Sequence, residues 1–206
     1  GAGKTTLMKI LLNLVRAENG EVKIFGKDHV KEEIKIKDRI GFVFEENPYY
    51  ENLKPSQVAK IISLAYSRWD WNYYRDLVKL FDLSEKPLGK LSKGQRMIFS
   101  FIVALSHQAE LLLLDEPTAG LDPVVRREFL NELRNYLAGG DRSVFFSTHI
   151  TSDLEQVADK IAFLHKGKIL FNEDVDELNS KYHLVRAEKS LLTKLDLIGY
   201  EEKKTH

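Results

Sequence analysis

The sequence predicts an α/β fold in which a parallel β-sheet is flanked by helices and carries an inserted helical segment. Short apolar runs typical of strands alternate with longer segments of helical spacing, as in parallel sheets covered on both faces. Between residues 54 and 107, by contrast, only the helical pattern occurs. The chain has 206 residues, of which 43% are hydrophobic, which is enough to bury a substantial core.

The first part of the chain is predicted to begin with a helix, followed by two short strands. Apolar residues recur at helical spacing from residue 7 to residue 15, and Gly20 follows the last of them. Residues 21–25 and 39–44 are short β-branched or aromatic runs with Gly or polar residues at their ends, as is usual for strands. The helical insert then has apolar stripes at residues 58–66, 73–81 and 97–105.

The second part returns to the alternation of strand and helix. Residues 111–114 form a short apolar strand, and the next helix is capped by Asp122, opened by Pro123 and ended by Gly139. Strand patterns follow at residues 143–147 and 161–164. The dipeptide Lys166-Gly167 predicts a hairpin turn into a last strand at residues 168–171.

The charge balance and the absence of cysteine exclude several classes of protein. There are 31 Lys+Arg and 31 Asp+Glu residues, so no global field attracts nucleic acid or an anionic membrane. No apolar stretch approaches the roughly 20 residues that span a bilayer, so we expect a soluble chain. Without cysteine there are no disulfides, thiolate nucleophiles or Cys-zinc sites.

The chain opens with a pattern that suits phosphate binding. Gly3-Lys4-Thr5 before a helix is the second half of G-x-x-x-x-G-K-[ST], a loop whose amides cradle phosphates. Lys4 would reach the phosphates and Thr5 would ligate Mg²⁺. The alternative is a plain Gly-rich turn before a helix. Because the chain begins inside this motif and without Met, we expect its natural amino terminus to be missing.

Two carboxylates, Asp115 and Glu116, follow the leucine strand. A phosphate-binding loop upstream would need one of them for magnesium, and the second could orient a water molecule. The alternative is a strand that simply runs into an acidic loop.

Two segments have the pattern of a capping box, Ser92 with Gln95 and Ser152 with Glu155. The first could also offer a helix amino terminus to an anion from another subunit. The sequence alone does not decide between an ordinary helix cap and such an anion site. Taken singly, Asp122 is explained as a helix cap. His149, just after a strand, is more often a hydrogen-bonded loop residue than a catalytic one.

Taken together and in order, these segments resemble the nucleotide-binding domain of ABC transporters over essentially the whole chain. Residues 1–6 resemble half of Walker A, 91–95 the signature, 111–117 Walker B, 119–122 the D-loop and 147–149 the switch histidine. Residues 66–83, with Trp69-Asp70, and residues 118–123 look most like bacterial ABC-2-type exporter ATPases.

The resemblance implies a P-loop NTPase with a RecA-like core. The ABC ATPase domain would cover residues 1–180, with the core at 1–50 and 109–180 and the helical subdomain at 51–108. Residues 181–206 would be a C-terminal extension.

The resemblance also implies that two such domains sandwich two ATP molecules. In each subunit, the phosphates would be bound by Gly1, Gly3, Lys4, Thr5 and Thr6. Mg²⁺ would be held by Thr5 and Asp115, Glu116 would be the base for the attacking water, and His149 would sense the γ-phosphate. The partner's nucleotide would be contacted by Ser92, Gly94 and Gln95, and Asp122 would link the two sites.

The implied protein is a cytoplasmic ATPase held peripherally at the inner face of the cell membrane. It would act as a homo- or heterodimer, and hydrolysis would drive a separate transmembrane permease subunit.

Two positions depart from the family's pattern. Glu45 stands where the family usually has the Q-loop glutamine, so it could contact nucleotide and coordinate the metal but also repel the triphosphate. We therefore expect Glu45→Gln to change the hydrolysis rate or the magnesium requirement. Lys93 replaces a signature glycine and either aids γ-phosphate binding or points to solvent.

Two other functions remain open at this point. A soluble ABC-type ATPase of translation or DNA repair would bind nucleic acid, but the chain has no basic stripe, second domain or long coiled coil, so we expect no nucleic acid partner. A nucleotide-gated regulatory module with little turnover would be distinguished by its catalytic rate.

Overall fold

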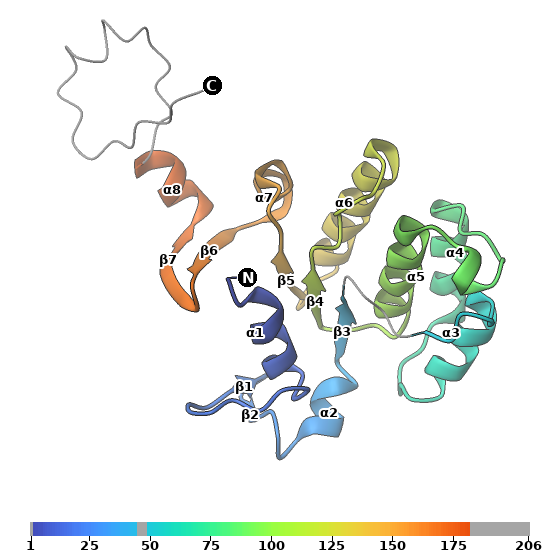
Figure 1. Cartoon of the computed structure of the whole chain (residues 1–206), viewed down its shortest axis with the longest axis horizontal. Coiled ribbons are helices and arrows are strands. Elements are labelled where there is room, and N and C mark those ends of the chain that lie inside the picture. The colour runs from blue at the N-terminus through green and yellow to red at the C-terminus, as the bar shows by residue number, and fades with distance from the viewer. Residues whose placement is uncertain (1, 45–48, 182–206) are drawn as a thin grey trace, which may run out of the picture.

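The computed structural model describes residues 2–44 and 49–181. Its centre is a parallel sheet of three strands in the order β3-β4-β5 (Figure 1). These strands are β3 (Ile40–Val43), β4 (Leu111–Asp115) and β5 (Ser143–Ser147). Residue 40 pairs with 111 and residue 111 with 143, so the carboxyl ends of all three strands meet at one edge of the sheet. The predicted parallel α/β core is confirmed.

The leucines of β4 explain how helices come to cover both faces of this sheet. Leu112 and Leu114 belong to a large core that includes residues of α5 (Lys93–Ser106) and α6 (Pro123–Ala138). Leu113 belongs to a second core, which includes residues that lie in α1 (Lys4–Leu11) and α2 (Glu33–Lys37) or directly beside these helices in the sequence. Because successive side chains of a strand point to opposite faces, a continuous leucine run is buried on both sides.

The inserted segment is helical as predicted. It contains α3 (Pro55–Ser63), α4 (Trp71–Leu80), the short 3₁₀ helix η1 (Leu88–Lys90) and α5. α5 packs directly on β3, where a Cβ atom on Gly41 would lie 2.7 Å from the Ala104 carbonyl oxygen. Glycine therefore permits this close approach of helix and strand.

The first helix is shorter than its apolar pattern predicts. α1 ends at Leu11 because Asn13 has a φ of 54°. The amide of Asn13 bonds to the carbonyl of Ile10 and that of Leu14 to the carbonyl of Lys9, as in a Schellman motif. The strand predicted at 21–25 is reduced to β1 (Lys23–Ile24), which pairs antiparallel with β2 (Lys27–Asp28).

The last two strands form a unit of their own. The predicted hairpin is confirmed, with β6 (Lys160–His165) antiparallel to β7 (Lys168–Asp174), and α8 (Val175–Lys181) follows. Among the described residues, this hairpin does not pair with the parallel sheet. A groove of about 470 Å³, whose lining includes Val144, Phe146 and Leu164, lies between β5 and β6.

One predicted helix start is wrong. α7 (Thr151–Val157) begins one residue before Ser152, and its N-cap residue is Ile150, whose side chain makes no capping hydrogen bond. The Ser152 hydroxyl instead accepts a hydrogen bond from Arg126. In the described part of the chain, no helix is both long and apolar enough to span a bilayer.

Candidate functional site

The start of α1 lies beside the end of β4. Gly3 precedes the helix with a φ of 101°, a conformation that favours glycine. The first two helical side chains reach the acidic pair, with Lys4 Nζ 2.7 Å from Glu116 Oε1 and Thr5 Oγ1 2.6 Å from Asp115 Oδ2. The structure thus brings together two motifs that are more than 100 positions apart in the sequence.

Asp115 is buried and fixed from two sides. Its Oδ2 accepts from Thr5, and its Oδ1 accepts from Ser147 Oγ at 2.6 Å. A hydroxyl and a carboxylate are ligands that suit Mg²⁺, which takes few protein ligands and completes its octahedron with water and phosphate oxygens. Thr5 and Asp115 therefore fit a Mg²⁺ site that includes a bound nucleotide. Glu45, the other expected metal ligand, lies outside the described residues, as does Gly1.

The carboxylate of Glu116 lies between the side chains of Lys4 and His149. Its Oε2 lies 2.7 Å from His149 Nδ1 and accepts from the His149 amide at 3.2 Å. Burial by itself raises the pKa of Glu116, but hydrogen bonds from Lys4 and His149 outweigh it and lower the pKa below its ordinary value. Glu116 is therefore ionised at neutral pH, in the form that can accept a proton.

The backbone of Glu116 is fixed by the neighbouring strand. Its φ is 49°, and its amide donates to the Ser147 carbonyl at 3.0 Å and lies 3.2 Å from Ser147 Oγ. Sequence reasoning missed this role of Ser147. The available signal was its position at the end of the next strand, where it stands opposite Asp115 in the sheet.

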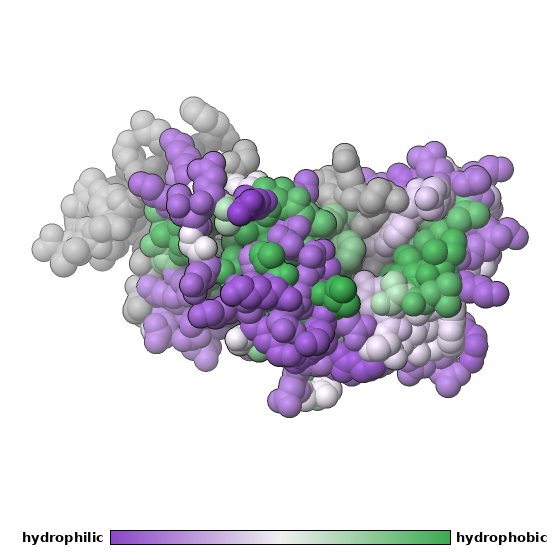
Figure 2. Space-filling model, turned by 90° about the horizontal axis from the view of Figure 1, so that it is seen from below, coloured by the Kyte–Doolittle hydropathy of each residue, from purple (hydrophilic) through white to green (hydrophobic). Residues whose placement is uncertain are grey.

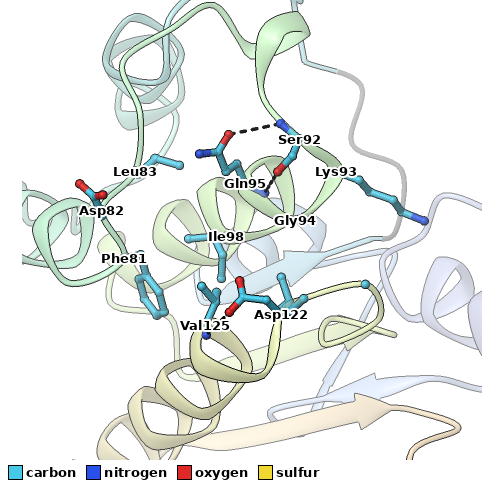
Figure 3. A pocket seen from close by; sticks show the side chains of 12 residues that line it. Phe81, Asp82, Leu83, Ser92, Lys93, Gly94, Gln95, Ile98, Asp122 and Val125 are labelled. Carbon is cyan, nitrogen blue, oxygen red and sulfur yellow. Dashed lines mark hydrogen bonds between the residues drawn. The ribbon is translucent and has the colours of Figure 1, made fainter.

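A second pocket contains the segment that resembles the signature (Figure 3). Its volume is about 640 Å³, and its lining combines the start of α5, the start of α6 and the turn after α4. The polar part of the lining comprises Asp82, Ser92, Lys93, Gln95 and Asp122, and the apolar part includes Phe81, Leu83, Ile98, Leu121 and Val125.

The polar side chains of this pocket cap the two helices. Ser92 Oγ accepts from the Gln95 amide at 3.1 Å, and Gln95 Oε1 accepts from the Ser92 amide at 3.2 Å, so the predicted capping box is confirmed. Asp122 accepts from the amides of Val124 and Val125, each at 3.1 Å, which confirms its predicted cap of α6.

The two groups of predicted site residues stay apart within one chain. Lys4, Glu116 and His149 are not among the residues that line the pocket of Ser92, Gly94 and Asp122. Thr6 lies exposed on α1. Lys93 is exposed as well, and in Figure 3 its side chain points away from Gln95.

The comparisons with known proteins agree with this geometry. The family model described as "ABC transporter" matches residues 1–119. The bacitracin transport ATP-binding protein BcrA of Bacillus licheniformis is 35% identical over 88% of this chain and 61% of its own length. The lantibiotic transport ATP-binding protein SrtF of Streptococcus pyogenes is 32% identical over 85% of this chain and 76% of its own length.

The fold is also that of a solved protein. The structure of an ATP binding subunit of an ABC transporter superposes with a TM-score of 0.78, at 24% identity, over 94% of this chain and 82% of that one. The chain spans about three fifths of the length of BcrA. With more than half of the chain matched by the family model, this protein belongs to the ATP-binding proteins of the ABC transporter family.

Proposed function

We propose that this chain is the ATP-hydrolysing subunit of a bacterial exporter, most similar to the ABC-2 type. The observation that carries the proposal is the convergence of Lys4, Thr5, Asp115, Glu116 and His149 at one edge of the sheet. Relatives named for bacitracin, lantibiotic and daunorubicin support the exporter part of the proposal.

In the proposed reaction Lys4 would bind the phosphates, and Thr5 and Asp115 would hold Mg²⁺, whose charge would offset that of the phosphates. When Lys4 and His149 turn to the nucleotide, Glu116 loses the two contacts that lower its pKa. Its basicity then rises, so that it becomes a better acceptor for a proton of the attacking water. Phosphoryl transfer depends mainly on such positioning and on charge stabilisation.

The separation of the two groups of residues favours a dimer. We propose that Ser92, Gly94 and Gln95 of one subunit contact the nucleotide held by the other, near the capped amino terminus of α5. Asp122, in the same pocket, would then lie at the contact between subunits. Either two copies or two related chains would satisfy this arrangement.

The proposed domain division places the core at residues 1–50 and 109–180, the helical subdomain at 51–108 and an extension at 181–206. The residues of α5 fall within the range of the helical subdomain, but the helix also packs on β3 of the core. It would therefore transmit movement between the two parts.

A transmembrane subunit is the proposed membrane partner, with this chain peripheral at the cytoplasmic face. Apolar residues gather on the surface over the part of the molecule that carries α3 (Figure 2). On and after this helix Ile61 is 55% exposed and Leu64 85% exposed. We propose that the helical segment contacts the partner there.

The test is steady-state phosphate release from Mg-ATP at increasing protein concentration. Glu116→Gln removes the proposed base. Glu110→Gln, at the other end of β4, removes the same charge where it pairs with Arg39 and Arg68. We expect turnover that rises faster than linearly with protein, collapses in Glu116→Gln and persists in Glu110→Gln. Tight ATP binding without turnover would favour a regulatory module instead.

A further inference from the structure

A buried carboxylate joins three segments behind the proposed catalytic loops. Asp153 is 0% exposed, and its Oδ2 accepts from Thr118 Oγ1 at 2.6 Å. Its Oδ1 accepts from Nε of Arg126 at 2.8 Å and also from Nη2 of the same guanidinium. The three residues come from α7, from the loop between β4 and α6, and from α6 itself.

Each arm of this junction is close in sequence to a residue of the proposed reaction. Thr118 lies two positions after Glu116 and four before Asp122. Arg126 is one turn into α6, and its amide bonds to the Asp122 carbonyl at 2.9 Å. Asp153 lies four positions after His149, in the first turn of α7. The junction therefore connects the loop of Glu116 and Asp122 with the loop of His149.

The chemistry of the junction makes it stiff. A carboxylate without access to water is stable only when donors surround it, and a fork-shaped guanidinium with a hydroxyl fixes it in one orientation. Thr118 is itself 2% exposed, so water cannot replace its hydroxyl without local opening. Loss of one donor would let the two loops move relative to each other.

We infer that Asp153, with Thr118 and Arg126, is a positioning residue that sets His149 against Glu116 and links both to the subunit contact at Asp122. This inference rests on the proposed ATPase function. None of the three residues touches the nucleotide in the proposed arrangement, and each acts through the loops that it holds.

The informative variant is Thr118→Val, because valine keeps the shape of threonine and removes only the hydroxyl. Thr118→Ser restores the hydroxyl and serves as the rescue. Tyr136→Phe is the matched control, since it removes a different buried hydroxyl, which lies on α6, 3.0 Å from the Ala109 carbonyl oxygen, at the end of the helix remote from Asp122. If Thr118→Val does not fold, Arg126→Lys is tested in its place, because lysine keeps the positive charge but lacks the guanidinium that donates two hydrogen bonds.

We expect kcat for Mg-ATP to fall about ten-fold in Thr118→Val, with nucleotide affinity unchanged within two-fold, because one buried hydrogen bond to a carboxylate is removed while Lys4 and Thr5 are untouched. Thr118→Ser should recover most of the rate, and Tyr136→Phe should leave kcat within two-fold of the unmodified protein. An unchanged kcat in folded Thr118→Val, or an equal loss in Tyr136→Phe, would overturn the inference.

A second measurement does not depend on turnover. Amide hydrogen exchange of nucleotide-free protein should become faster in residues 147–153 in Thr118→Val and not in Tyr136→Phe, although the substitution is about 30 positions away in sequence. If the unmodified protein has no ATPase activity, the proposed function fails while this measurement still tests the junction. Unchanged exchange in residues 147–153 would show that Thr118 does not hold the His149 loop.

Discussion

The ion pair between Lys4 and Glu116 in the nucleotide-free protein is expected to lower the affinity for nucleotide. The pair must separate before Lys4 can bind a phosphate. At 2.7 Å and an effective dielectric constant of about 20, the attraction alone is about 6 kcal/mol. Solvation offsets most of it, since the Lys4 side chain is 36% exposed and that of Glu116 is 17% exposed. A net value of about 1 kcal/mol is typical of such a pair.

Glu116→Gln should therefore tighten nucleotide binding by about five-fold, which is the factor that about 1 kcal/mol corresponds to. Removal of a negative charge near the phosphates acts in the same direction. ADP is the suitable ligand, because its β-phosphate reaches the same lysine and it is not hydrolysed in the titration. Titration calorimetry of the two proteins with ADP gives the ratio of the dissociation constants directly.

Glu110→Gln is again the matched control, because it makes the same change of net charge directly before the same strand, away from Lys4. It should leave the affinity for ADP unchanged. Added salt should reduce the effect of Glu116→Gln, since it screens the partly exposed pair. An unchanged or weaker affinity in Glu116→Gln, or the same gain in Glu110→Gln, would refute the reasoning.

Three further predictions concern the framework that holds the site. Gly41→Ala should lower stability by about 1–3 kcal/mol in urea unfolding, because the new Cβ would lie 2.7 Å from the Ala104 carbonyl oxygen. Burial lowers the pKa of His107 below its ordinary 6.5, so the unfolded chain binds more protons than the folded one as the pH falls through 6.5. The free energy of unfolding should therefore fall as the pH drops below 6.5, and His107→Gln should flatten this slope. Tyr73→Phe should lower the melting temperature through a loss of about 1–3 kcal/mol, since its hydroxyl bonds to Glu132 at 2.6 Å, and an unchanged melting temperature would contradict this.

The sequence predicted the elements whose signals are local. The leucine run of β4, the cap at Asp122 and the box of Ser92 and Gln95 each depend on residues within about four positions of one another. Such patterns survive in the fold because neighbouring residues supply most of their partners. The hairpin at Lys166 was predicted for the same reason.

Local patterns were wrong where a distant or specific contact competed with them. The pattern of α1 runs on to residue 15, but the left-handed Asn13 ends the helix at Leu11. Ser152 had the sequence of a cap, and its hydroxyl accepts from Arg126, 26 positions away, instead. The strand of residues 161–164 was expected to add to the parallel sheet, whereas β6 pairs only with β7 among the described residues.

The sequence by itself determined which residue types are available to the site, because Lys4, Thr5, Asp115, Glu116 and His149 stand out in motifs. Only the tertiary structure decided that Lys4 and His149 both bind Glu116. It also decided that Ser147 fixes Asp115, and that a buried Asp153 joins the loops behind the site. These contacts join segments about 30 to 110 positions apart, and only the closure of the chain around the sheet brings them within hydrogen-bonding distance.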